Sequence, residues 1–491
     1  MDLDHDRCYR AVRSRDPRFD GRFFTAVKTT GIFCRPVCPA RTPRRENVTF
    51  FRTAAAAEGA GFRPCRRCRP ETAPGSAAWD HDSALVTRAL RLIDDGSLDG
   101  AKGAALATRL AISERQLRRV FRSHLGTTPA AIARSRRAHL ARRLLDDTDL
   151  PISDIAFASG FGSLRQFNDV MRSVFRCTPT ELRDRGTPTS PAAPVRLRLS
   201  YRPPFAWEPM GRFLGARAID GVESWDGSAY RRLIATGDDV AAIEVTNDEA
   251  RSEILVHLRS PRLPALLPVS SRLRRMFDLD NDPAAVLEVL GRDRALGPIA
   301  QRTPGLRVPG SWDPMEPIVR AVVGQQISVA AARTVVARVA RAFGQEVAGF
   351  EDLELHTTFP SAADLVDAPL ETTGVTARGA AAIRELARLH VSGVLADATA
   401  RGTEELVATM EGVRGVGAWT AGYAAMRGYG EPDVFPSGDL GLRKAATTWF
   451  DSIPATGELE QRAERWRPWR SYAALHLWNG ANAENEEETW I

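Results

Sequence analysis

The sequence predicts a multidomain protein that is mostly α-helical, with smaller α+β parts. Three observations lead to this prediction. The chain has 491 residues, which is enough for three or four domains that each bury a core. Apolar residues recur at helical spacing through most of the chain, whereas residues 195–299 contain alternating, strand-like stretches such as VRLRLSY, AAIEVTN and ILVHLRS. Two pairs of closely spaced cysteines near the start indicate a small domain built around a metal ion.

Charge is distributed unevenly along the chain. Residues 1–190 carry 34 Lys and Arg against 21 Asp and Glu, a net charge of +13, so the remaining residues carry −7. The basic part predicts a surface for phosphate groups, while the rest must bind nucleic acid through a few placed groups. No apolar run of 18 residues occurs, and the first residues lack a signal-peptide pattern. We therefore expect a cytoplasmic protein that does not contact a membrane.

The cysteines predict a zinc site in a small domain at residues 1–75. Four of the six form two knuckles with three and two intervening residues: Cys34, Cys38, Cys65 and Cys68. This spacing is typical of one tetrahedral Zn²⁺ held by four thiolates. The site is either purely structural or reactive, because arginines surround it and a zinc-bound thiolate is a nucleophile if exposed. Cys8 and Cys177 lie outside the pattern, and we expect them to be ordinary thiols in a reducing compartment.

The segment around the first knuckle supports the reactive interpretation. Residues 20–51, DGRFFTAVKTTGIFCRPVCPARTPRRENVTFF, closely resemble the N-terminal domain of Ada-type proteins. The resemblance implies that Cys34 irreversibly accepts a methyl group from a methylphosphotriester in DNA, while the other three cysteines remain zinc ligands. It also makes Thr30, Arg35 and Arg41 candidates for holding the DNA backbone.

Helical patterns extend from a Pro/Gly/Ser break at residues 72–78 to about residue 185. Two helix-turn-helix patterns can be recognised, AALATRLAISERQLRRVFRSHLG and ISDIAFASGFGSLRQFNDVMRSVFRCTPTELR, with turns near residues 112–113 and 160–163. Two such patterns in tandem resemble the AraC-type regulators, so we expect an all-α DNA-binding domain at residues 79–185. The side chains that either face DNA or simply form a solvated helix face are Arg115, Arg118, Arg119, Arg165 and Gln166.

The second half follows a Pro-, Ser- and Thr-rich stretch at residues 186–194, which predicts an extended linker. We then expect an α+β domain with an antiparallel sheet at residues 195–305 and an all-α domain at residues 306–483. The acidic residues 484–491 predict a tail without fixed structure.

A glycine-rich turn between two helices is the central feature of this half. Helical spacing over residues 403–411 and 418–427 places Gly415 and Gly417 in a hairpin. Bare backbone N–H groups at such a turn can clamp a phosphate, although G-x-G turns also simply close helical hairpins. Asp439 follows a Pro-Ser-Gly loop at the start of the next helix, where an aspartate is commonly an N-cap.

The hairpin belongs to a longer set of matching segments. VRGVGAWTAGY, DVFPSGDLGLRK and RWRPWRSYAALHLW, with LSYRPPFAWEPMGRFLGARAIDGVE and VVGQQIS, resemble the AlkA-type 3-methyladenine DNA glycosylases of the helix-hairpin-helix superfamily. The resemblance covers residues 195–479 and implies that Asp439 stabilises an oxocarbenium-like transition state. It places Gln326 where the family has a leucine that fills the space left by the flipped base. The aromatic residues that it implies for the base pocket, each otherwise a core residue, are Trp419, Tyr423, Trp478 and Phe213.

These resemblances imply an Ada–AlkA fusion: a methylphosphotriester methyl acceptor and transcriptional activator joined to a DNA glycosylase. Trp419 stands where related lyases carry a lysine, so we expect base removal without strand cleavage. Expected partners are double-stranded DNA and, for an activator, RNA polymerase; we expect a monomer at the bacterial nucleoid. No cysteine cluster near the C-terminus supports an iron–sulfur cluster, and no Pro-Cys-His motif supports a second methyltransferase half. Two alternatives stay open: a regulator whose glycosylase half only binds DNA, and a glycosylase recruited by an inactive zinc module.

Overall fold

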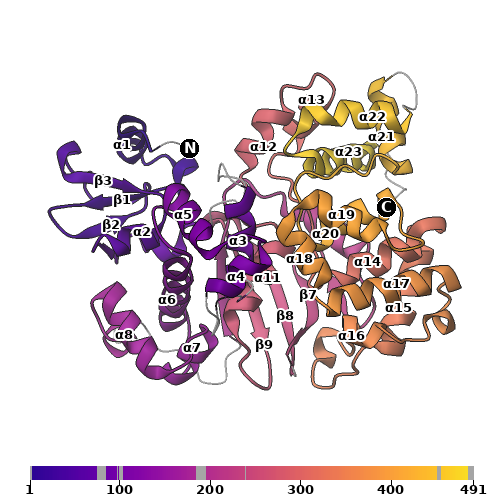
Figure 1. Ribbon diagram of the computed structural model, residues 1–491, viewed down its shortest axis with the longest axis horizontal. Helices are drawn as coiled ribbons and strands as arrows, with labels where there is room; N and C mark the ends of the chain where they lie inside the picture. Colours follow the sequence, from indigo (N-terminus) through magenta and orange to yellow (C-terminus); the bar gives the residue numbers. More distant parts are fainter. Residues whose placement is uncertain are drawn as a thin grey trace. The chain divides into compact units, whose positions relative to one another are not determined.

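The computed structural model describes residues 3–74, 84–94, 96, 98, 103–183, 195–237, 239–450 and 455–484 (Figure 1). The chain divides into two compact units, Met1–Arg202 with Glu253–Arg272 and Pro203–Ser252 with Leu273–Ile491. Both units combine helices with small sheets, which confirms the predicted fold class. The predicted linker at residues 186–194 and all but the first residue of the predicted tail lie outside the described residues.

The first unit begins with a four-stranded sheet in the order β3-β1-β2-β4. Strands β1 (Phe24–Val27), β2 (Ile32–Cys34) and β3 (Val48–Phe51) pair antiparallel, and β4 (Arg63–Pro64) pairs parallel with β2. Side chains alternate across the sheet. One set packs with Cys8 of α1 (His5–Ser14), and another packs with Ala57 of α2 (Ala54–Gly59).

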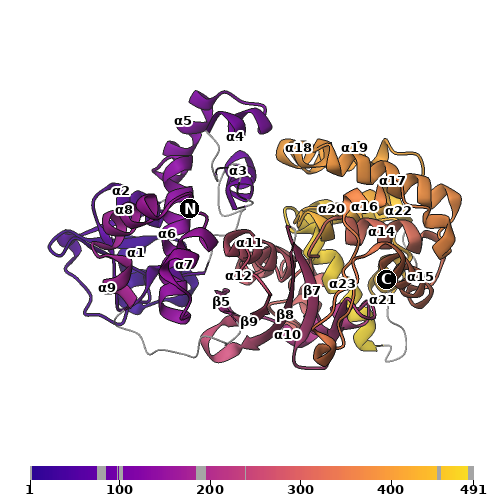
Figure 2. The same ribbon diagram turned by 90° about the horizontal axis from the view of Figure 1, so that it is seen from below.

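Two helix-turn-helix pairs follow, as predicted. They are α4 (Gly103–Arg109) with α5 (Glu114–Leu125), and α7 (Ile152–Ala158) with α8 (Leu164–Phe175). Each second helix begins at a serine N-cap, Ser113 or Ser163. Helix α5 ends after the buried Leu125, where Gly126, with φ of 69°, forms the C-cap. The other helices here are α3 (Ala84–Asp94), α6 (Pro129–Asp147), which contacts α5, α7 and α8, and α9 (Pro179–Arg183) (Figure 2).

Alternation of apolar residues correctly predicted three of the strands described here, β5 (Val195–Ser200), β8 (Asp239–Asp248) and β9 (Glu253–Arg259). In the first unit β5 (Val195–Ser200) pairs antiparallel with β9 (Glu253–Arg259), with Val195 opposite Leu258. In the second unit β6 (Glu223–Trp225), β7 (Tyr230–Thr236) and β8 (Asp239–Asp248) form an antiparallel meander, with Tyr230 opposite Val245.

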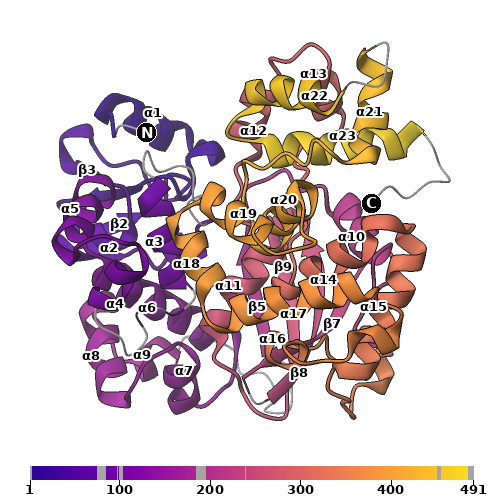
Figure 3. The same cartoon turned by 45° about the vertical axis from the view of Figure 1, so that its right-hand side comes forward.

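Helices make up the rest of the second unit, and α20 is central among them. Helix α20 packs against α14 and α19, and α21 packs against α23 (Figure 3). Residues 420–427 of α20 are all buried, as expected for a helix that other elements enclose. Helix α11 (Leu266–Met276) contains the boundary between the units. The helices of the unit are α10 (Trp207–Gly215), α12 (Pro283–Leu290), α13 (Leu296–Arg302), α14 (Met315–Val323), α15 (Val329–Phe343), α16 (Ala362–Leu365), α17 (Ala377–Val391), α18 (Val394–Arg401), α19 (Thr403–Glu411), α20 (Ala418–Gly428), α21 (Leu440–Phe450), α22 (Thr456–Ala463) and α23 (Arg470–Glu484).

Two differences from the sequence predictions concern helix ends. Helix α20 includes Gly428, one residue beyond the predicted end, and α23 includes Glu484, the first residue of the predicted tail. Within the described residues, no helix is both long and apolar enough to cross a bilayer.

Candidate functional site

The hairpin between α19 and α20 has the backbone that its glycines predicted. Gly415 has φ of 102°, a conformation that residues with a Cβ rarely adopt, and a Cβ there would lie 3.3 Å from Nε of Arg378. Gly417 is exposed and is the N-cap of α20, with no side chain bonded to the first turn. Gly417 therefore offers no side-chain cap to the first N–H groups of α20, which leaves these groups suited to an anion.

Asp439 is buried, 2% exposed, and both of its carboxylate oxygens accept hydrogen bonds. Oδ2 accepts from the indole N–H of Trp419 at 2.8 Å, and Oδ1 accepts from the indole N–H of Trp478 at 3.1 Å. Oδ1 also accepts from the backbone N–H of Leu442 at 2.7 Å, which caps α21. These contacts are compatible with both interpretations of Asp439, as the N-cap of α21 and as the carboxylate that stabilises the transition state.

Trp419 and Tyr423 form one wall of a pocket beside Asp439. Their rings stack with centroids 5.6 Å apart and planes 22° apart. The pocket has a volume of about 490 Å³, including the part open to solvent. The residues that line it are Arg217, Arg320, Ala321, Gly324, Ile327, Val329, Ala332, Arg333, Val336, Trp419 and Tyr423. Trp478 and Phe213, also predicted for the base pocket, are not among them.

Two arginines that the sequence did not mark lie against this aromatic wall: Arg217, which also lines the pocket, and Arg427. Arg427 Nη1 donates to the Tyr423 hydroxyl at 2.7 Å, and the guanidinium groups of Arg217 and Arg427 lie 3.7 and 4.6 Å from the ring centroid of Phe213. Phe213 therefore supports the arginines. No sequence signal marked them, because arginine is abundant throughout the chain and burial depends on the tertiary fold.

The same cluster shifts two pKa values in the pocket wall. Burial lowers the pKa of Arg217 to about 10, although the neighbouring Tyr423 opposes this shift. Burial alone would raise the pKa of Tyr423, but the positive charges of Arg427 and Arg217 outweigh it and lower the pKa. The wall thus carries positive charge next to an aromatic face.

A short turn before α15 is tied to the hairpin. Gln325, in the turn Gly324–Gln326, donates from Nε2 to the carbonyl oxygen of Gly415 at 2.9 Å and to Oγ1 of Thr420 at 3.0 Å. The side chain of Gln326 lies outside what the structure describes, so its assignment as the wedge stays a prediction.

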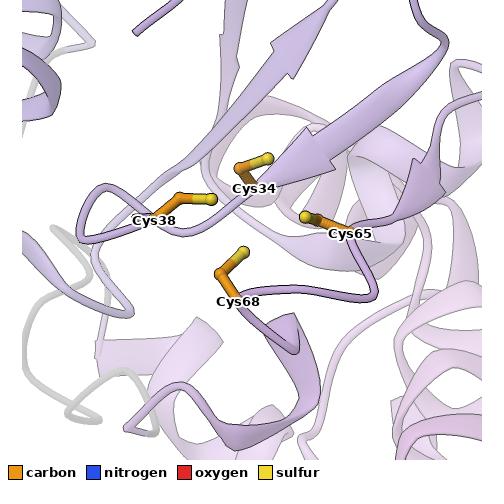
Figure 4. Close-up of side chains that lie close together, drawn as sticks. All are labelled: Cys34, Cys38, Cys65 and Cys68. Atoms are coloured by element: carbon orange, nitrogen blue, oxygen red, sulfur yellow. The ribbon is translucent and has the colours of Figure 1, made fainter. Parts of the chain in front are cut away.

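The four predicted cysteines converge in the first unit (Figure 4). Strands β2 and β4 run parallel, with Phe33 paired to Pro64, so Cys34 and Cys65 follow at the same end of the two strands. The four sulfur atoms lie within 4.8 Å of one another, close to the ~3.8 Å edge of a tetrahedron with Zn–S bonds of ~2.3 Å. The set fits one zinc ion. Cys65 and Cys68 are buried, whereas Cys34 and Cys38 are half-buried.

The candidate backbone-binding residues near the zinc site differ in their surroundings. Arg35 donates from Nε to Asp20 at 2.9 Å and from Nη1 to Thr72 at 2.7 Å, and its backbone N–H donates to Cys68 Sγ at 3.4 Å. Its guanidinium is therefore held within the protein. Thr30 and Arg41 are exposed, in the β1–β2 turn and the loop after Cys38. Contact of all three with DNA stays a prediction.

The two remaining cysteines lie outside the four-sulfur cluster. Cys8 is in the core under β3, and Cys177 accepts a hydrogen bond from Arg66 Nη2 at 2.6 Å.

Side chains on the second helix of each helix-turn-helix pair are exposed but not equivalent. Arg115 and Arg119 are exposed on α5, as is Arg118, which pairs with Glu114 at 2.5 Å. Arg165 is exposed at the start of α8. Oε1 of Gln166 instead accepts from the backbone N–H of Gly162 at 3.2 Å, so this side chain already has a local partner.

Family profiles match the chain in four consecutive segments. The metal binding domain of Ada matches residues 7–71, a helix-turn-helix domain residues 106–185, the AlkA N-terminal domain residues 196–313, and the HhH-GPD superfamily of base excision DNA repair proteins residues 319–471. Among solved structures, a 3-methyladenine DNA glycosylase from Archaeoglobus fulgidus aligns with 59% of this chain and 99% of its own, with a TM-score of 0.52 and 23% identity. That likeness supports the fold of the second half.

Curated relatives extend the match over the whole chain. A Mycobacterium tuberculosis protein named a probable bifunctional transcriptional activator/DNA repair enzyme AlkA is 42% identical over 490 residues, 97% of each chain. DNA-3-methyladenine glycosylase 2 of Escherichia coli is 34% identical over 283 residues, 57% of this chain and 95% of the relative. The E. coli enzyme Ada is 43% identical over 143 residues, 29% of this chain and 39% of the relative.

Fold, sites and matches together define a DNA repair protein in which an Ada-type zinc and helix-turn-helix module precedes an AlkA-type glycosylase. The chain belongs to the family of bifunctional transcriptional activators and DNA repair enzymes represented by the M. tuberculosis protein. This confirms the predicted Ada–AlkA fusion.

Proposed function

We propose that this chain excises alkylated bases from double-stranded DNA at Asp439 and accepts a methyl group from DNA methylphosphotriesters at Cys34, which turns it into a transcriptional activator. The observation that carries the first activity is the buried Asp439 carboxylate, oriented by two indole N–H groups beside a pocket with an aromatic wall. A base that has left the duplex stacks on the Trp419–Tyr423 pair, as flipped bases do in enzymes that act on them.

Excision of an alkylated base requires few catalytic groups besides the Asp439 carboxylate. Alkylation at N3 or N7 leaves a purine cationic, so the glycosidic electron pair passes to the base and the base departs neutral. Asp439 stabilises the positive charge that develops on the sugar. Water then adds to the sugar carbon and loses a proton, which leaves an intact abasic strand. The alternative nucleophile of a lyase is missing at the hairpin because Trp419 has no amine.

We assign methyl transfer to Cys34, one of the more accessible sulfur atoms of the cluster. When bound, a zinc ion keeps all four cysteines as thiolates at neutral pH. Cys34 is half-buried, whereas Cys68 is buried and already accepts the Arg35 N–H, which reduces its nucleophilicity. The sulfur of Cys34 forms a bond to the methyl carbon as the carbon–oxygen bond of the triester breaks, and the electron pair stays on the resulting phosphodiester.

The remaining assignments complete the proposal. Gly415 and Gly417 contact a DNA phosphate, and Arg115 and Arg119, with Arg118, contact DNA through α5. We place the domains at the boundaries given by the sequence, residues 1–75, 79–185, 195–305 and 306–483. We also infer RNA polymerase as partner of the activator, a monomeric chain, and action at the nucleoid in the bacterial cytoplasm.

One experiment separates the proposal from its two alternatives. Purified full-length protein is incubated with methylated duplex DNA, and both free 3-methyladenine and methyl groups bound to protein are measured. Both products are expected. Methyl transfer alone would favour a regulator whose glycosylase half only binds DNA, and base release alone would favour a glycosylase recruited by an inactive zinc module.

A further inference from the structure

Arg378 is an exposed arginine at the start of α17, and its side chain lies across the hairpin between α19 and α20. A Cβ at Gly415 would lie 3.3 Å from Nε and 3.4 Å from Cγ of Arg378, so the stem of the arginine packs over the bare α-carbon of this glycine. Exposed arginines are common on protein surfaces, so exposure alone assigns no role. The packed stem, however, places a cationic group directly beside the proposed phosphate clamp.

The charge of Arg378 is not balanced within the protein. Its side chain makes no hydrogen bond or ion pair with any part of the chain that the structure describes. Arg384, two turns further along the same helix, instead pairs with both carboxylate oxygens of Glu371, at 2.8 and 3.1 Å. Arg414, which precedes Gly415 in the hairpin, is exposed and, among the described residues, also lacks such a partner. Two uncompensated positive charges therefore lie at the hairpin, although residues 191–491 carry a net negative charge.

We infer that Arg378 binds a phosphate of the DNA strand that the hairpin holds. This inference rests on the proposed glycosylase function, in which the hairpin contacts DNA. Backbone N–H groups donate to a phosphate but carry only partial charge, whereas a guanidinium adds a full positive charge and paired donors that match phosphate oxygens. Because the stem of Arg378 is already packed against Gly415, binding costs less side-chain entropy than it would for a freely rotating arginine. The contact adds affinity without sequence preference.

The test measures the affinity of the full chain for a duplex with a tetrahydrofuran abasic analogue at several salt concentrations. Arg378→Met keeps most of the apolar stem and removes the charge. It should bind about tenfold more weakly, and the slope of log affinity against log salt should become shallower by about 0.9, as expected for one lost phosphate contact. Arg378→Lys keeps the charge and should retain the slope. Arg384→Met is the matched control, because it removes an arginine of the same helix that Glu371 already neutralises, and it should bind as wild type does.

A wild-type slope in Arg378→Met would overturn the inference. So would an equal change of slope in Arg384→Met, which would indicate a general loss of positive charge, or in Arg378→Lys, which would show that charge is not the cause. The zinc and helix-turn-helix domains are identical in all variants and contribute equally to each slope. Release of 3-methyladenine by wild type is measured on a separate alkylated duplex. Because the abasic analogue carries no base, failure of base release together with the expected change of slope would count against the glycosylase and not against the phosphate contact.

Discussion

The indole N–H of Trp478 donates to Oδ1 of Asp439 at 3.1 Å, although 39 residues separate the two in the chain. The indole N–H of Trp419, in α20, donates to the other carboxylate oxygen, Oδ2, at 2.8 Å. Helices α20 and α23 therefore both fix the carboxylate that begins α21. This arrangement costs the fold little, because each buried indole N–H also needs an acceptor.

Replacing Trp478 with phenylalanine should slow base excision by about tenfold or more, because it keeps an aromatic ring but removes a donor that orients Asp439. Single-turnover release of 3-methyladenine measures this effect. Trp466→Phe is the control: Trp466 is also buried, and its indole N–H donates to Asp293 at 3.0 Å, away from the pocket. Equal losses of excision in the two variants would show that the effect is general destabilisation.

Cys34→Ser should abolish methyl uptake from phosphotriester DNA and leave base release intact. Methylation of one thiolate changes the formal charge of a four-thiolate zinc site from −2 to −1, which reduces repulsion from DNA phosphates. Wild-type protein should therefore bind its specific DNA more tightly after methylation, and Cys34→Ser should show no such gain. Cys177→Ser is the control. Methyl transfer to the Cys34→Ser protein would show that another residue is the acceptor.

Borohydride should trap no covalent complex between the enzyme and alkylated duplex. Lys444, the only lysine in the sequence of the glycosylase half, is exposed on α21, whereas Asp439 is buried. A Schiff base would require an amine at the sugar. The assay is gel electrophoresis after reduction, with Lys444→Ala alongside wild type. A trapped adduct that disappears in Lys444→Ala would move Lys444 into the active site and make the enzyme a lyase.

His476 should make the fold sensitive to acid. It is 2% exposed, and burial lowers its pKa from 6.5 to about 4. Between these values the unfolded chain binds a proton that the folded chain does not, so this group's contribution is complete above pH 6.5 and is lost as pH falls toward 4. The loss is at most about 1.4 kcal/mol per pH unit. Thermal unfolding at pH 7.5 and 5 should show a smaller decrease for His476→Gln than for wild type, with His390→Gln as control; equal decreases would refute the assignment.

Local patterns were enough to predict much of the fold. Helical spacing placed α19 and α20 within one residue, alternation found β5, β8 and β9, and cysteine spacing found all four members of the sulfur cluster. Each of these signals is a short-range periodicity or spacing that the tertiary fold preserves.

The hydrogen-bond partners of long polar side chains could not be predicted in the same way. The sequence marked Arg35 and Gln166 as candidates for DNA contact, yet the structure gives them partners in Asp20 and Gly162. Long polar side chains reach several neighbours, and the fold decides which one they meet. The buried Arg217 and Arg427 escaped notice for the same reason, because nothing local distinguishes them from the exposed arginines of a chain with 67 basic residues.

The role of Asp439 as the catalytic carboxylate is tested by comparing the release of 3-methyladenine from methylated duplex DNA by wild type and by Asp439→Asn. Asparagine keeps the size of the side chain and much of its capping ability but removes the charge, and loss of an electrostatic stabiliser costs on the order of 10²-fold in rate. We predict that the variant binds DNA as wild type does and excises the base at least about 100-fold more slowly. Near-normal excision by Asp439→Asn would contradict this account and leave Asp439 only as the N-cap of α21.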